Sequence, residues 1–204
     1  MSFLKSSFSA PLWPAHNLLL LIAFIALSLA PAAAHAKVTA LTKDNVTDFI
    51  KQTTKVADGH ASEMNAQQAR SYLEKHVQND ARFKSKVEFH IAGYPTQETT
   101  MSMDKKQFMQ AAAESAGKVK DYHSEIQVLS VKVAANGKSA VAETKSKEEV
   151  IISVPTEDNT GMQEMPVEGD SICTQTIMLN KQGVIQMYSA QCTTDIAFIG
   201  DDDF

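Results

Sequence analysis

Apolar residues recur at the three- and four-residue spacing of an amphipathic helix in the first part of the chain. One such stretch, with Asp44 in its first turn and Gly59 beyond its end, predicts a helix near 43–57. A second predicts a helix that begins after Asn65 and ends near residue 78. The residues that form the two apolar faces are Val46, Phe49, Ile50 and Val56 in the first helix, and Ala69, Tyr72, Leu73, His76 and Val77 in the second.

Two further elements follow before the pattern changes. Alternation of apolar and polar residues predicts a strand at Lys86–Ile91, which Gly93 and Pro95 end. Ser102 is then expected to cap a helix at about 103–115.

From Val119 onward the hydrophobic period is two, as in β-strands. Asn136-Gly137 favours a tight hairpin, because both residues tolerate a positive φ. Residues 154–169 hold two Pro and two Gly, which is typical of a mobile loop. The whole order predicts a single α+β domain over 37–204 that ends in an acidic tail at 197–204. The four strands are expected at about 119–134, 138–153, 170–180 and 184–196.

The N-terminus predicts a secretory signal peptide over residues 1–36. The apolar run Leu18–Ala30 is shorter than the roughly 20 residues that a membrane-spanning helix needs. The small residues of the motif AHA favour cleavage between Ala36 and Lys37. The alternative is an uncleaved anchor. Cleavage predicts a periplasmic or secreted protein with no stable membrane span.

Charge narrows the choice of partners. Removing the signal peptide takes away one lysine and no acid, so the formal net charge of −5 becomes −6. Only Arg70 and Arg82 supply the forked donors that usually grip phosphates and base edges. The composition therefore argues against nucleic acid, and against an anionic membrane surface, as a partner.

The stretches IQVLSVKVAANGKSAVAET and GDSICTQTIMLNKQGVIQMYSAQ, with helices before MDKKQFMQAAAE, resemble the nuclear transport factor two-like (SnoaL-like) superfamily. The resemblance covers nearly all of 43–196 and rests on element order, hydrophobic pattern and turns. It implies N-terminal helices packed in a strongly bent antiparallel sheet, which together form a cone with a pocket at its open end. It also implies a homodimer formed through the outer face of the sheet.

His76 shares a helical face with Tyr72, and the implied cone would turn that face toward the pocket. The competing interpretation, which we favour, is a core or rim histidine hydrogen-bonded to backbone.

His123 alternates with Asp121 and Glu125 on one face of a predicted strand. A histidine beside carboxylates can act as a general base, and enzymes of the resembled superfamily use His, Asp and Tyr inside the cone. No family catalytic motif matches this sequence residue by residue. The favoured interpretation is an exposed polar strand face, like the alternating charges Glu143, Lys145, Lys147 and Glu149.

No metal site and no cofactor are predicted. His60, His76, His90 and His123 make no H-x-H, H-x-x-x-H or H-E-x-x-H pair. Seven methionines after residue 100 hint instead at a pliable apolar pocket, although core filling explains most of them equally well.

Two functions are consistent with these features. The preferred one is an exported, non-enzymatic module that binds an apolar small molecule or a protein partner through its cone pocket or sheet face. The alternative is a cofactor-independent isomerase, dehydratase or hydrolase that uses His76, His123 and Tyr188.

Cys173 and Cys192 are expected to form a disulfide, because exported thiols that can meet are usually oxidised. A type I turn with a Gly bulge over Asn180–Gly183 would send the two sulfurs to opposite faces of the hairpin. A two-residue turn at Gln182-Gly183, or one further bulge in either strand, would place the cysteines directly opposite each other. The oxidising environment of an exported protein favours the bond, and we therefore expect it to form.

The first prediction concerns export. The purified protein should begin at Lys37, because the AHA motif and the short apolar run make cleavage the expected outcome. Edman sequencing of the exported protein checks this, and an intact Met1 in the membrane fraction would contradict it.

Overall fold

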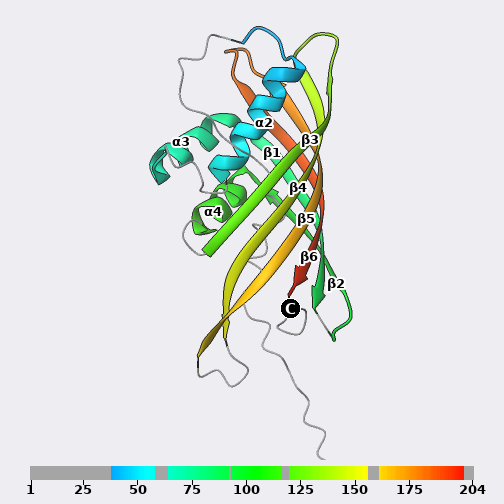
Figure 1. The fold of residues 1–204 in the computed structure, drawn as a ribbon. Helices are drawn as coiled ribbons and strands as arrows, with labels where there is room; N and C mark the ends of the chain where they lie inside the picture. Colours follow the sequence, from blue (N-terminus) through cyan, green and yellow to red (C-terminus); the bar gives the residue numbers. More distant parts are fainter. Residues whose placement is uncertain (1–37, 58–63, 92, 116–119, 156–160, 200–204) are drawn as a thin grey trace, which may run out of the picture.

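The computed structural model describes residues 38–57, 64–91, 93–115, 120–155 and 161–199 (Figure 1). The signal peptide, its cleavage point and His60 lie outside these residues. Within them, none of the helices combines the length and the apolar character needed to cross a membrane. The helices are α2 (Lys43–Ala57), α3 (Ala66–His76) and α4 (Lys105–Ser115), and the strands are β1 (Val77–Ile91), β2 (Gln97–Asp104), β3 (Lys120–Val133), β4 (Ser139–Pro155), β5 (Met162–Leu179) and β6 (Ile185–Phe198).

The strands form one six-stranded sheet in the order β2-β1-β6-β5-β4-β3. The predicted α+β class is confirmed, but the sheet is mixed rather than antiparallel, because β1 and β6 run parallel. The other neighbouring pairs, β1–β2, β3–β4, β4–β5 and β5–β6, are antiparallel. No tight turn joins β1 to β6, so their relative direction depends on how the first half of the chain docks against the second.

The first strand is longer than its pattern predicted, and a second strand was missed. β1 begins at Val77, directly after α3, and its alternation of buried and exposed residues runs well before Lys86. In β2 only Met103 is buried, as expected for the edge of a sheet, and Met101 and Met103 by themselves give an apolar alternation too short to reveal the strand.

The helix α4 begins two residues later than predicted, and its cap is not Ser102, which lies in β2. The Gln107 backbone N–H donates to Asp104 Oδ1 (2.9 Å), and the Asp104 N–H donates to Gln107 Oε1 (3.0 Å). This reciprocal pair is a capping box, which satisfies two backbone donors at once.

The expected loop at 154–169 is largely strand. β4 continues to Pro155 and β5 begins at Met162, so that Val154 lies opposite Gln163. Pro166 is tolerated within β5 because the last residue pair of β5 with β6 is Val167 with Phe198; one residue further, Pro166 only accepts, through its carbonyl, from the Ile199 N–H (3.1 Å). The acidic tail predicted to begin at residue 197 begins later, because β6 extends to Phe198.

All three helices lie on one side of the twisted sheet and bury its inner face (Figure 1). Helix α2 contributes Val46 and Ile50, both fully buried. Helix α4 contributes Phe108, whose ring stacks on Phe83 of β1 with centroids 4.4 Å apart. These apolar contacts fix the helices against the sheet.

The β5–β6 hairpin resolves the open question about the cysteines. The Asn180 N–H donates to Val184 O (3.0 Å), and Gly183 has a φ of +81°. This turn gives the register that would separate the cysteines. One extra residue at Tyr188 then shifts β6, so Cys173 lies directly opposite Cys192 and the two form a disulfide.

The second prediction concerns this bond. The double variant Cys173→Ala/Cys192→Ala should be less stable than the wild type by about 3 kcal/mol, because the bond closes a loop in the unfolded chain. Urea unfolding measures the difference, and wild-type protein reduced with dithiothreitol provides the control. Equal stability, or two alkylatable thiols in the unreduced, denatured wild type, would contradict the assignment.

Candidate functional site

Helix α3 places two of the candidate side chains together. Its start is fixed by a capping box, in which the Gln68 N–H donates to Asn65 Oδ1 and the Asn65 N–H donates to Gln68 Oε1, both at 2.9 Å. Tyr72 and His76 lie four residues apart on one face of this helix, so their rings stack with centroids 4.2 Å apart. The ring of Phe49 on α2 lies 5.8 Å from that of His76.

His76 is half-buried and joins α3 to the start of β6. Its Nδ1 lies 2.8 Å from the carbonyl oxygen of Ile185. A carbonyl only accepts, so Nδ1 carries the proton in this hydrogen bond. Gln186 makes a second link, by donating from Nε2 to the Lys75 carbonyl at 2.8 Å. This geometry fits the interpretation of His76 as a histidine hydrogen-bonded to backbone.

The Tyr72 hydroxyl is also engaged. Its oxygen lies 3.2 Å from Thr53 Oγ1, and the Thr53 hydroxyl donates to the Phe49 carbonyl at 2.9 Å. The Tyr72 hydroxyl is therefore the donor toward Thr53. Burial raises the pKa of Tyr72 to about 12.

The other two candidates do not join this pair. His123 is exposed on the outer face of β3, opposite Glu149, and Glu125 is exposed on the same face. Tyr188 is 40% exposed at the bulge of β6. The set of His76, His123 and Tyr188 therefore does not converge on one point.

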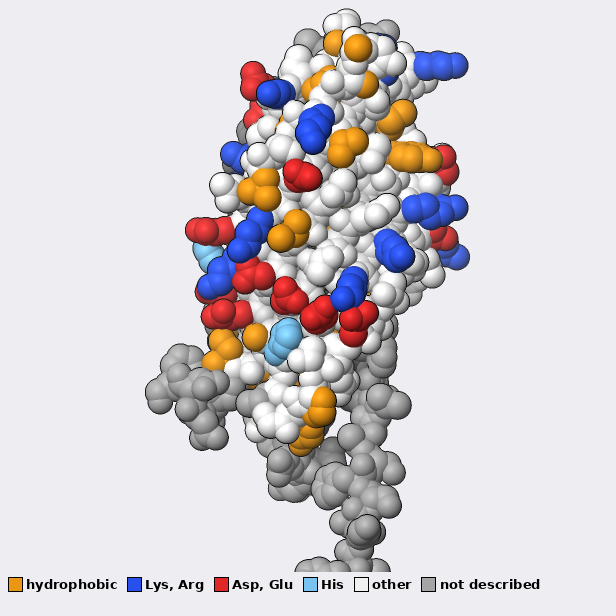
Figure 2. Space-filling view, turned by 90° about the vertical axis from the view of Figure 1, so that its right-hand side faces the viewer, with side chains coloured by type: hydrophobic (Ala, Val, Ile, Leu, Met, Phe, Trp, Pro, Cys, Tyr) orange, Lys and Arg blue, Asp and Glu red, His pale blue; other side chains and the backbone are white. Residues whose placement is uncertain are grey.

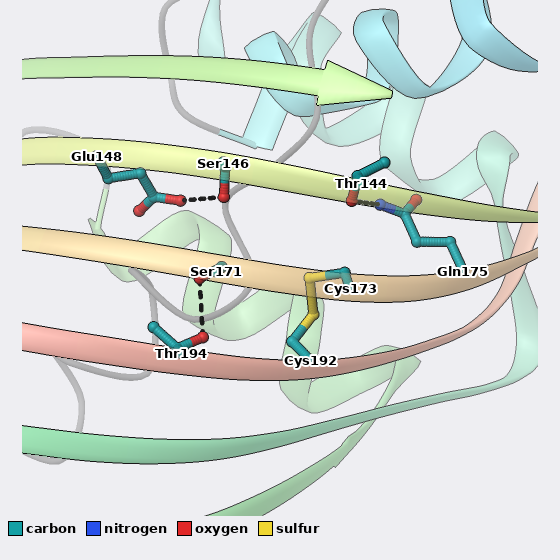
Figure 3. Close-up of a disulfide and its surroundings, with 8 residues drawn as sticks. All are labelled: Thr144, Ser146, Glu148, Ser171, Cys173, Gln175, Cys192 and Thr194. Carbon is teal, nitrogen blue, oxygen red and sulfur yellow. Dashed lines mark hydrogen bonds between the residues drawn. A yellow bond between two sulfur atoms is a disulfide. The ribbon is translucent and has the colours of Figure 1, made fainter. Parts of the chain in front are cut away.

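Sequence reasoning missed a band of polar side chains on the inner face of the sheet. Figure 3 shows most of it around the disulfide. Ser171 and Thr194 share a hydrogen bond of 2.8 Å, and Gln175 Nε2 donates to Thr144 Oγ1 at 3.1 Å. We call these residues the inner polar band; each is at most 2% exposed, and they are Ser85, Thr144, Ser146, Glu148, Ser171, Gln175 and Thr194.

The pairing register of the strands places two residues of the inner polar band next to the disulfide. Thr144 lies opposite Cys173, and Ser85 lies beside Cys192. Among the described residues, Ser85 Oγ and Gln175 Oε1 are buried without a hydrogen-bond partner. Leaving such an atom unsatisfied costs about 1–3 kcal/mol, so these two atoms lower the stability of the fold.

The sequence did contain a signal for this band. The ladder of Glu143, Lys145, Lys147 and Glu149 is exposed as predicted, with Lys147 Nζ 2.8 Å from Glu149 Oε1. Strand alternation then places Glu148 on the opposite face, together with Val150 and Ile152. The sequence pattern alone could therefore have predicted that the Glu148 carboxylate lies on the buried face.

A cleft of about 840 Å³ lies between α2, α3 and α4. Its size is within the range of small-molecule sites. The apolar part of its lining is Val56, Met64, Ala69, Leu73, Met109 and Ala112.

Two charged residues of α3 also line this cleft. Glu74 is paired, because Lys105 Nζ lies 3.1 Å from its Oε1 and donates to its carbonyl oxygen at 2.7 Å. Arg70, one turn earlier, has no ion pair within the part of the chain that the structure describes. The cleft therefore combines an apolar lining with one cation available to a ligand.

Comparisons with known proteins give matches to solved structures alone; no protein-family model and no curated protein matches the chain. An NTF-2 like protein of unknown function from Silicibacter pomeroyi is 16% identical over 74% of this chain and 98% of its own, with a TM-score of 0.37. A hexachlorocyclohexane dehydrochlorinase from Novosphingobium barchaimii is 9% identical over 72% and 87%, with a TM-score of 0.44. ActVI-ORFA from Streptomyces coelicolor is 11% identical over 70% and 88%, with a TM-score of 0.38.

The superfamily that the sequence resembles thus recurs among the matched structures. At these identities and TM-scores, the matches carry no conclusion about what this chain does.

The third prediction uses the buried phenol. Because the pKa of Tyr72 is about 12 in the folded chain against the ordinary 10.0, its stabilising contribution is fully present below pH 10 and is lost as the pH rises toward 12. Tyr72→Phe should therefore lose less stability than the wild type across this window. Urea unfolding on either side of pH 10 measures it, and identical pH profiles would contradict the burial of the phenol.

Proposed function

We propose that the chain is an exported, non-enzymatic module that binds an apolar small molecule in the cleft between α2, α3 and α4. The observation that carries the proposal is the apolar lining of this cleft, in which Met64 and Met109 contribute adaptable thioethers from separate segments. Burial of an apolar ligand against such side chains would supply the main driving force.

Arg70 narrows the chemical class of the ligand. It lines the cleft without an intramolecular ion pair among the described residues, whereas Lys105 already neutralises Glu74. A carboxylate at one end of an apolar ligand would pair with the guanidinium in a bidentate manner. The ligand class that fits best is an amphipathic organic acid such as a fatty acid.

An isomerase, dehydratase or hydrolase is less well supported. Such an enzyme needs its acid and base within hydrogen-bond reach of one substrate position. His76 instead lies half-buried at the end of α3, whereas His123 and Tyr188 are exposed on other parts of the molecule.

Export is part of the proposal. The signal-peptide pattern of residues 1–36 and the bond between Cys173 and Cys192 both fit an oxidising compartment, so the protein is proposed to be periplasmic or secreted.

The outer face of the sheet is a less specific candidate for a protein partner. Its exposed apolar side chains include Leu129, Val141 and Ile172, and Figure 2 shows apolar groups on this face separated by polar ones. The homodimer implied by the superfamily resemblance stays a prediction.

The fourth prediction tests the cleft with two probes, dodecanoate and dodecan-1-ol. Calorimetric titration should show binding of both, with dodecanoate tighter because it can pair with Arg70. Ala69→Phe should weaken both by about tenfold or more, since the added ring fills the cleft and displaces apolar contacts.

Ala197→Phe is the matched control, because this alanine is exposed on β6 and does not line the cleft. Arg70→Gln should remove the preference for dodecanoate and leave dodecan-1-ol binding unchanged. If the wild type binds neither probe, or if Ala69→Phe binds as tightly as Ala197→Phe, the proposed cleft function is wrong.

A further inference from the structure

Four acidic residues form one continuous row across the outer face of the sheet. Asp170 of β5 lies opposite Asp195 of β6, Asp195 lies beside Glu88 of β1, and Glu88 lies opposite Glu98 of β2. Like charges in directly opposed positions on neighbouring strands are destabilising. Figure 2 shows acidic and basic side chains gathered in a band across this face.

Nearby lysines neutralise most of this row. Lys145 lies 3.1 Å from Asp170, while Lys86 lies 2.7 Å from Glu88 Oε1 and 2.8 Å from Glu98 Oε2. The hydrogen bond from Lys86 also keeps the pKa of Glu88 below its usual value.

Asp195 is the exception. Within the described part of the chain, the ionic partner of Asp195 is His90, whose Nε2 lies 3.9 Å from Asp195 Oδ1. That separation is longer than a hydrogen bond. The row therefore has a position where a further positive charge would relieve repulsion between Asp195 and its acidic neighbours.

His90 is oriented toward this position. Its Nδ1 lies 3.2 Å from the Thr96 hydroxyl, and a partner on one ring nitrogen fixes the direction of the other. Glu88 and His90 are two residues apart on β1 and so share the outer face with Asp195. One ligand atom from each of Glu88, His90 and Asp195 lies within 4.8 Å of the others.

We propose that Glu88, His90 and Asp195 bind a divalent transition cation of the Zn²⁺ class on the outer face of the sheet. One imidazole and two carboxylates are a donor set that Zn²⁺ accepts, with water at the fourth position. The imidazole favours Zn²⁺ over the harder ions Ca²⁺ and Mg²⁺. The three side chains are at least partly exposed and can close around an ion by small rotations.

This site is separate from the proposed cleft and requires no part of it. No metal site was predicted from the sequence, because the four histidines after residue 36 form no H-x-H, H-x-x-x-H or H-E-x-x-H pair. Here the third ligand, Asp195, follows His90 by more than a hundred residues and reaches it only through the parallel pairing of β1 with β6.

The fifth prediction tests this site with ZnCl₂ as the sole ligand. Tag-free protein treated with EDTA and then freed of it should bind one Zn²⁺ per chain in a calorimetric titration. His90→Ala, Asp195→Asn and Glu88→Gln should each weaken binding by about tenfold or more, as loss of a metal-site partner does. The ¹⁵N resonance of His90 Nε2 should shift when Zn²⁺ is added to the wild type.

His123→Ala is the matched control. His123 is an exposed histidine on the same outer face, opposite the carboxylate of Glu149, but it lies outside the three-residue cluster. This variant should bind Zn²⁺ as the wild type does. Absence of binding at millimolar Zn²⁺, unchanged affinity in His90→Ala, or an equal loss in His123→Ala would each overturn the proposal.

Discussion

The extra residue at Tyr188 determines which face of the sheet every later residue of β6 occupies. Side chains alternate along a strand, so a one-residue change of register exchanges the buried and exposed sets. Before the bulge, Ile185 and Met187 are buried; after it, Cys192 and Ile196 are buried. Without the bulge Asp195 would point toward the core, and the disulfide could not form in this register.

The bulge also determines which side chains of β1 and β5 lie next to those of β6 on each face of the sheet. On the inner face it places Thr194 beside Ser171 and Cys192 beside Ser85. On the outer face it places Asp195 between Asp170 and Glu88. Burying polar groups and aligning like charges both cost free energy. The apolar contacts between helices and sheet, together with the disulfide, offset these costs.

The helices provide a different kind of surface. The capping box at Asn65 fixes where α3 begins, and His76 and Gln186 fix where it ends against β6. A helix held at both ends keeps Arg70 and Leu73 in constant positions on the cleft wall. These contacts favour a cleft wall that is formed before a ligand arrives, which would lower the entropic cost of the binding proposed above.

The sequence by itself determined the features that depend on neighbouring residues: the three helices, five of the six described strands, the β3–β4 and β5–β6 hairpins and the α+β class. These follow from periodicity, caps and turns, whose physical causes act over a few residues. In the edge strand β2 the apolar alternation is limited to Met101 and Met103, which is too short to predict a strand. The prolines and glycines of residues 154–169 favoured a loop where β5 begins.

Tertiary structure alone decided the parallel pairing of β1 with β6, the bulge at Tyr188 and the separation of the candidate site residues. Tyr72 and His76 are one helical turn apart, so their contact was predictable, whereas the position of His123 depended on which face of β3 packs against the core. The meeting of His90 with Asp195 depends on two strands from opposite ends of the domain lying side by side. Such contacts arise from the burial of one continuous core, to which every element contributes and which no local pattern specifies.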